Sequence, residues 1–161
     1  MNDILIVGAG NPLLKDEGIG VYIIEKLVRI GLPSNVQIID CGSDLSIILT
    51  QLRSHRKIII IDAIRAGGEP GQVYRFNYDE LKEVKNSFRS AHQLSVVEVL
   101  KLLKQTHHNL SSCKIILIGI EPETISPGTE LSKKVEASID EAISTVLREI
   151  LPEKDILEKV R

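Results

Sequence analysis

Aromatic side chains are scarce in this chain: three tyrosines and two phenylalanines make up 3% of its 161 residues, and there is no tryptophan. Proteins that bind single-stranded nucleic acid stack bases on aromatic rings, so this composition argues against that class. A net charge of −2 likewise predicts no basic surface for nucleic acid or for an anionic membrane. Since 43% of the residues are hydrophobic, we expect an aliphatic core of Ile, Leu and Val.

Long apolar runs are missing too. No run approaches the roughly 18 residues that a membrane span requires, and Met1 leads directly into a strand-like segment instead of a signal peptide. The two cysteines, Cys41 and Cys113, are typical of reduced thiols rather than of a disulfide framework. We therefore expect a cytoplasmic protein without a membrane partner.

Short, continuous, mostly β-branched runs predict strands that are buried on both faces. They cover residues 4–7, 36–39, 57–61 and 114–118. Between and after them, apolar residues recur at helical spacing over residues 20–30, from 45 onward behind Ser43 or Asp44 as N-cap, from 96 onward, and from 135 to a stop before Pro152.

Residues 73–77 also have a strand pattern, but their connection from Asp62 is too short for a crossover helix, which predicts an antiparallel edge strand. The fold class is therefore α/β: a three-layer α/β/α sandwich around a twisted, mostly parallel five-stranded sheet with one antiparallel edge strand. We expect a single domain over residues 1–161, with a charged C-terminal tail at 153–161 that frays.

Polar or glycine-rich segments follow each predicted parallel strand. They are Gly8-Ala9-Gly10 with Asp16-Glu17, Asp40-Cys41-Gly42-Ser43, Asp62, and Gly119-Ile120-Glu121. Ligand sites of open α/β sheets lie outside the carboxyl ends of the strands, so these segments predict one shared cleft.

Two carboxylates and one imidazole make a metal site, and this chain can supply them from the pair Asp16-Glu17, from Asp62 and from His92. His92 stands at a predicted helix N-terminus, where the helix dipole disfavours imidazolium and leaves a neutral ring able to bind metal. Each residue also has an ordinary explanation, namely a first-turn acid, a turn or capping residue, and a surface histidine. The remaining histidines, His55 and His107-His108, are expected on the solvated surface.

Two alternatives remain open. Gly8 and Gly10 after a strand, with Asp40 ending the next, favour a dinucleotide site, but Leu13 occupies the third glycine position of G-x-G-x-x-G. Cys41 could act as a nucleophile with His92 as its base, although a packed thiol is the simpler interpretation. The motifs of P-loop hydrolases, zincins and serine hydrolases do not occur.

Taken together, these segments closely resemble the [NiFe]-hydrogenase maturation endopeptidases. The resemblance begins at residues 8–20 (GAGNPLLKDEGIG) and continues through residues 40–43, 60–63, 70–71, 90–94 (SAHQL) and 119–122. It covers nearly the whole chain up to the charged tail. The chain departs from the family pattern at Cys41-Gly42, where a glycine pair is usual, and this affects a loop expected to contact substrate.

The resemblance implies a cytoplasmic, metal-dependent, aspartyl-type protease that acts as a monomer. It would remove the C-terminal extension of a hydrogenase large-subunit precursor after nickel insertion. Glu17, Asp62 and His92 would bind the metal, which is the nickel carried by the substrate, and cadmium or zinc could replace it in vitro. Asp16 and Asp40 are the candidates for the supporting catalytic role. The alternative function is a nickel-binding checkpoint or chaperone that docks on the precursor without cutting it.

Overall fold

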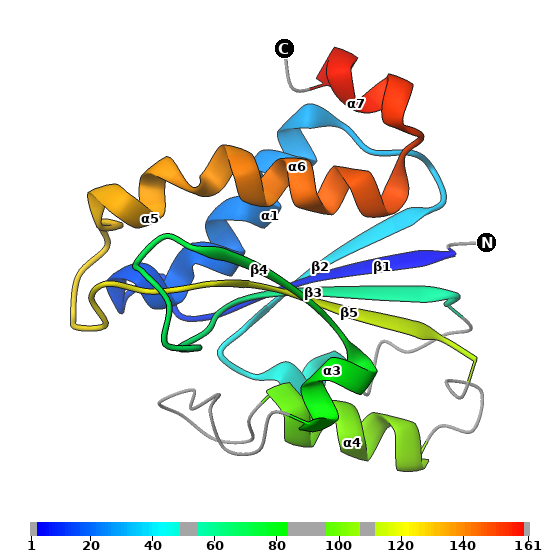
Figure 1. Ribbon diagram of the computed structural model, residues 1–161, viewed down its shortest axis with the longest axis horizontal. Helices are drawn as coiled ribbons and strands as arrows, with labels where there is room; N and C mark the ends of the chain where they lie inside the picture. Colours follow the sequence, from blue (N-terminus) through cyan, green and yellow to red (C-terminus); the bar gives the residue numbers. More distant parts are fainter. Residues whose placement is uncertain (1–2, 49–54, 84–95, 107–111, 160–161) are drawn as a thin grey trace.

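The computed structural model describes residues 3–48, 55–83, 96–106 and 112–159. They form one five-stranded sheet with helices on both faces (Figure 1). The strands are β1 (Ile4–Ala9), β2 (Val36–Gly42), β3 (Lys57–Ala63), β4 (Val73–Asn77) and β5 (Lys114–Ile120). Their order is β2-β1-β3-β5-β4, and only β4 runs antiparallel to its neighbour. The predicted mostly parallel sheet with an antiparallel edge strand is confirmed.

The central strands are continuous apolar runs because helices cover both of their faces. In β3, Ile58 to Ile61 are all fully buried. Successive strand residues point to opposite faces, so Ile58 and Ile60 belong to one hydrophobic core, and Ile59 and Ile61 belong to the other. Both cores are mainly aliphatic, as the composition predicts.

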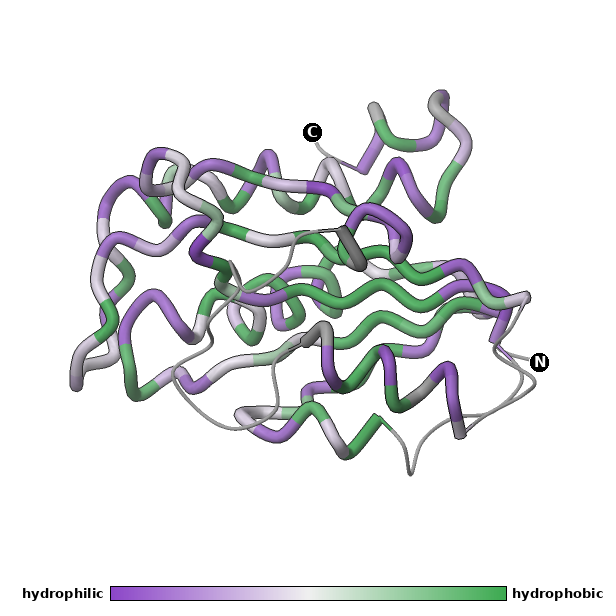
Figure 2. Tube along the Cα trace, turned by 60° about the horizontal axis from the view of Figure 1, so that its bottom comes forward, coloured by the Kyte–Doolittle hydropathy of each residue, from purple (hydrophilic) through white to green (hydrophobic). Residues whose placement is uncertain are grey.

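Two helical layers enclose the sheet. One contains α1 (Ile19–Ile30), α5 (Lys133–Ala137), α6 (Ile139–Ile150) and α7 (Glu153–Lys159), and the other contains the 3₁₀ turn η2 (Leu45–Ile47), α3 (Tyr78–Glu83) and α4 (Val96–Thr106). Figure 1 shows these layers above and below the sheet. In Figure 2 the apolar strands lie between helices in which polar and apolar residues alternate. The predicted three-layer sandwich is therefore confirmed.

The helix predicted to end before Pro152 is divided in two at Ser138. The buried Ser138 hydroxyl donates to the carbonyl of Val135 (2.6 Å), and its backbone N–H donates to the same carbonyl (3.0 Å). A serine that bonds to the preceding turn competes with the regular helical ladder. Val135 and Ile139 still pack in the same core on either side of the break.

The expectation of a frayed tail is wrong for residues 153–159, which form α7. Ile156 is only 9% exposed and packs into the core beside α6. The Lys159 ammonium donates to the carbonyl of Gly31, just after the end of α1 (2.7 Å). One buried side chain and one capping contact therefore hold this charged segment on the body of the protein.

Other helix signals have local causes. Asp44 caps η2, as predicted, because its carboxylate accepts from the backbone N–H of Ser46 (3.0 Å). The sequence analysis did not predict α3, which begins after Asn77. The Asn77 side chain accepts from the N–H of Glu80 and donates to its carboxylate, a reciprocal pair like a capping box.

Among the described residues, no helix has both the length and the apolar character needed to cross a bilayer.

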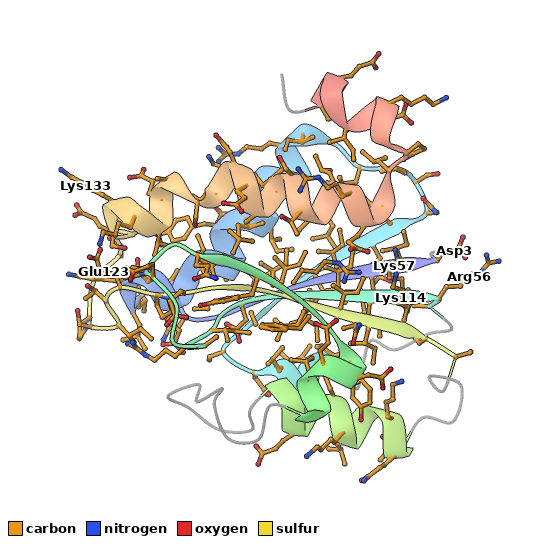
Figure 3. All side chains as sticks on the ribbon, viewed as in Figure 1. Asp3, Arg56, Lys57, Lys114, Glu123 and Lys133 are labelled. Atoms are coloured by element: carbon orange, nitrogen blue, oxygen red, sulfur yellow. The ribbon has the colours of Figure 1, made fainter. Side chains whose placement is uncertain are left out.

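The four parallel strands end at the same edge of the sheet, and the chain continues from each end into a polar loop. Figure 3 shows Glu123, just beyond β5, at this edge, and Asp3, Arg56 and Lys114 at the opposite edge. The carboxyl edge is therefore the place where the candidate site residues can meet.

Candidate functional site

The loop after β1 folds tightly against the turn that carries Glu17. Gly10 has a positive φ of 125°, and a side chain there would collide with the Glu17 carbonyl oxygen. The N–H of Gly10 donates to the carbonyl of Gly42 (2.7 Å), which ties this loop to the end of β2. The space beside Gly10 is filled by the protein's own backbone, so this glycine serves close packing of the loop.

Glu17 lies in the 3₁₀ turn η1 (Lys15–Gly18), immediately before α1. Its Oε2 atom is buried and accepts no hydrogen bond from any residue that the structure describes. A buried carboxylate oxygen without a donor costs free energy, about 1–3 kcal/mol or more. A bound cation would remove that cost. Glu17 therefore differs from an ordinary solvated first-turn acid.

Asp62 lies in β3, next to its carboxyl end, and is 6% exposed. One carboxylate oxygen accepts from the N–H of Ala63 (2.8 Å). Burial raises the pKa of Asp62 to about 7, the Ala63 hydrogen bond opposes this rise, and the nearby charge of Glu17 adds to it. The two predicted ligands are therefore close enough to repel each other when both are ionised. A cation between them would offset that repulsion.

His92, the third predicted ligand, lies outside the described residues. Within the described part of the chain, no group of three or more His, Cys, Asp or Glu side chains could hold a metal ion. The pair of Glu17 and Asp62 nevertheless fits a metal, because carboxylate oxygens are suitable ligands and one of them has no described donor. The structure places two carboxylates near each other, and the roles of Glu17, Asp62 and His92 as metal ligands stay predictions.

Asp16 is adjacent to Glu17 in sequence but is fully buried. One carboxylate oxygen accepts from the N–H groups of Glu123 (2.9 Å) and Thr124 (2.8 Å) and from the Ser132 hydroxyl (2.9 Å). The other accepts from the N–H of Ser132 (2.8 Å). These four bonds fasten the segment 123–132 to η1. The catalytic role of Asp16 stays a prediction, and this geometry indicates a structural one.

Asp40 lies near the end of β2 and is exposed. Its Oδ1 atom accepts from the N–H of Gly42 (2.9 Å), an arrangement that shapes the turn after the strand. The side chain remains open to solvent, so a role in moving a proton at this edge stays a prediction for Asp40.

Cys41 has the environment of a packed thiol. It is 3% exposed, and its Sγ donates to the carbonyl of Gly8 (3.3 Å). Burial raises the pKa of the Cys41 thiol to about 12, and the charges of Asp62 and Asp40 contribute. The thiol is therefore protonated at neutral pH and unsuited to nucleophilic attack. The effect of the Asp62 charge on this thiol shows that the two side chains lie near each other.

Glu121 is a site-edge residue to which the sequence analysis gave no role. It is 5% exposed, and its Oε2 accepts from the N–H of Ala66 and from the Tyr74 hydroxyl (both 2.8 Å). The N–H of Gly68 donates to the same hydroxyl (3.0 Å). This network holds the loop that follows Asp62. The sequence feature that could have identified Glu121 is its place directly after a buried strand, in a segment predicted to lie at the cleft.

His55 was expected on the solvated surface, and that expectation is wrong. It is 4% exposed, and its Nε2 lies 3.3 Å from Oε1 of Gln37. His55 lies two residues before β3, at the end of the strand opposite to Asp62. The sequence pattern around it is basic and polar, so it gave no sign that the ring would pack at the amino edge of the sheet. His107 and His108 lie outside the described residues.

Comparison with known proteins identifies the family of this chain. The model of a family described as hydrogenase maturation protease matches residues 21–149. A putative hydrogenase maturation protease of Methanocaldococcus jannaschii is 37% identical over 155 residues, covering 92% of this chain and 96% of that protein. The solved structure of the hydrogenase maturating endopeptidase HybD from Escherichia coli superposes with a TM-score of 0.80 at 35% identity, covering 94% and 98% of the two chains. The chain therefore belongs to the hydrogenase maturation protease family.

Proposed function

We propose that this protein removes the C-terminal extension from the large-subunit precursor of a [NiFe]-hydrogenase after nickel has been inserted. The observation that carries the proposal is the neighbouring pair of Glu17 and Asp62, of which Asp62 is buried and Glu17 has a buried oxygen without a described donor. Family membership supports a protease of hydrogenase maturation. We further propose that it acts as a monomer in the cytoplasm.

The nickel would arrive as part of the substrate, and Glu17, Asp62 and His92 would contact it. Two carboxylates and a neutral imidazole leave other coordination positions for the precursor's own ligands. Bound in this way, nickel would supply Lewis-acid chemistry next to the peptide bond. Cadmium or zinc could replace it in vitro, because borderline divalent ions accept the same ligand types.

The same pair of carboxylates explains how an empty precursor would be refused. A precursor without nickel brings no positive charge to Glu17 and Asp62, so their mutual repulsion and the unpaired oxygen remain. A nickel-loaded precursor would offset the repulsion between the carboxylates and would give the unpaired oxygen a partner. Discrimination is then the difference between the two binding free energies, with the bare carboxylates acting against the wrong substrate.

Proton transfer at the site would fall to a carboxylate that solvent can reach. Asp40 meets this requirement because it is exposed at the carboxyl edge of the sheet. Asp16 is fully buried, and both of its oxygens accept hydrogen bonds. We therefore propose Asp40 as the supporting catalytic residue and assign Asp16 to holding the turn that carries Glu17.

Intact-mass measurement of the precursor tests this function. The wild-type protein should release a C-terminal peptide from nickel-loaded precursor and leave nickel-free precursor unchanged. Asp62→Ala and His92→Ala should abolish release while the protein stays folded, and Glu25→Ala, at an exposed position in α1, should retain full activity. Equal cleavage of both precursor forms would contradict the nickel gate.

A second candidate is a checkpoint that binds loaded precursor without cutting it. The observation that favours it is that both carboxylate oxygens of Asp16 accept hydrogen bonds. Asp16 is therefore less free to take part in catalysis beside the two proposed ligands. A stable complex with loaded precursor of unchanged mass would support the checkpoint. Loss of the C-terminal peptide would exclude it.

A further inference from the structure

Leu13 is the most exposed large apolar side chain in the described part of the protein. It is 65% exposed, compared with 60% for Val28 and 38% for both Ile47 and Leu102. A single exposed leucine is ordinary on a protein surface. Leu13 differs because of where it lies and how its backbone is held.

The backbone of Leu13 is held from both sides. Its N–H donates to the side-chain oxygen of Asn11 (3.0 Å), and its carbonyl accepts from the N–H of Gly128 (2.9 Å). The next residue, Leu14, forms a bridge with Gly128. The N–H of Lys15 donates to the Gly128 carbonyl (2.9 Å), and Lys15 has a positive φ of 52°. The backbone of the loop is therefore held in place at Leu13, while the side chain is exposed.

This loop belongs to the same compact turn as Glu17. Gly18 packs so closely on Pro12 that an added Cβ would lie 2.5 Å from the proline Cα. The position of Gly10 is similarly closed by the Glu17 carbonyl. The N–H of Glu17 lies 3.4 Å from the carbonyl of Leu14. Leu13 is thus an exposed apolar residue on the loop that packs against the turn of Glu17.

We propose that Leu13 is a specificity-determining contact that receives an apolar side chain of the precursor polypeptide. This inference rests on the proposed function, since it places the precursor's metal-bearing region at Glu17. Because the backbone at Leu13 is already held, binding would order little additional chain, and the exposed side chain would gain by leaving water. Leu13 would therefore strengthen binding of the precursor polypeptide, whereas Glu17 and Asp62 would bind the metal that the precursor carries.

Val28 supplies a matched control. It is almost as exposed as Leu13, but it lies in the last turn of α1, about 13 Å along the helix from its first residue. Leu13→Ser and Val28→Ser remove comparable apolar surface, one beside Glu17 and one away from it. Leu13→Met keeps the apolar character, so it should restore binding.

The experiment measures Kd for nickel-loaded precursor, together with KM and kcat for peptide release. Leu13→Ser should raise Kd and KM about tenfold, as a contact of moderate strength would, with kcat within about twofold of wild type. Leu13→Met and Val28→Ser should bind like wild type. An unchanged Kd in Leu13→Ser, or an equal loss in Val28→Ser, would overturn the inference. Wild-type binding without peptide release would contradict the protease function alone, because the Kd comparison still decides the role of Leu13.

Discussion

Burial of the Asp62 carboxylate lowers the stability of the protein at neutral pH, and Asp62 is also one of the proposed metal ligands. Its pKa is raised from 3.8 to about 7, mainly by burial and further by Glu17. Between these values the folded protein holds a proton that the unfolded chain releases, so the free energy of unfolding falls as pH rises. The stability that the protonated Asp62 carboxyl provides is fully present below about pH 3.8 and is lost as pH rises through about 7. The difference corresponds to about 4 kcal/mol.

We therefore predict that Asp62→Asn stabilises the metal-free protein at neutral pH. Its advantage over wild type should grow from pH 4 to pH 8, up to a few kcal/mol, because asparagine does not titrate. Urea unfolding at several pH values measures this difference. Asp140→Asn, at an exposed position in α6, should show a nearly constant difference. An advantage of Asp62→Asn that does not change with pH would contradict the raised pKa.

The positions of Glu17 and Asp62 at the carboxyl edge of the sheet could be predicted, because Glu17 comes after a glycine turn and Asp62 lies at the end of an apolar run. Their role as metal ligands stays a prediction. The burial of Asp16 could not be predicted. Its hydrogen-bond partners, Glu123, Thr124 and Ser132, lie 107 to 116 positions away in the chain. No local sequence pattern indicates a contact between such distant positions. The burial of His55 escaped prediction for the same reason, since its partner Gln37 is on another strand.

The Asp16 carboxylate accepts four of the hydrogen bonds that join η1 to the segment 123–132, and backbone bonds from Lys15 to Gly128 and from Asp16 to Thr124 add to them. Asp16→Ala would leave three N–H groups and one hydroxyl without their acceptor. We predict a loss of about 2–4 kcal/mol in the free energy of unfolding, because buried donors left unpaired are costly. Chemical denaturation provides the measurement.

The control for this prediction is Asp140→Ala, which removes an exposed acid from the first turn of α6. It should cost less than about 1 kcal/mol through the helix dipole alone. If Asp16→Ala is no more destabilising than this control, Asp16 does not hold the segment in place.

Secondary-structure elements were predictable where a periodic pattern and a clear boundary coincide. The β-branched runs predicted the parallel strands, and the stop at Gly31 predicted the end of α1. The break at Ser138 was not predictable, because apolar spacing continues through it. The helix α7 was not predicted because most of its residues are charged and few are apolar, although Ile156 is buried. The cap at Asn77 was a local signal that could have predicted α3.

In the molecule as a whole, the parallel sheet explains why distant sequence segments form one site. The strands β1, β2, β3 and β5 are parallel, so Glu17, Asp40, Asp62 and Glu121 all follow or end strands at one edge. Composition and periodicity predicted this common edge. They could not predict which side chains are buried there, because burial depends on the loops that pack over the strand ends.

The most direct test of a nickel site at Glu17 and Asp62 is a crystal structure of the protein soaked with nickel. We predict an anomalous peak at about 2.1 Å from carboxylate oxygens of both residues, with a nitrogen of His92 completing the set. The peak should weaken strongly in Glu17→Gln crystals. Nickel bound elsewhere, with no ion between Glu17 and Asp62, would contradict the account.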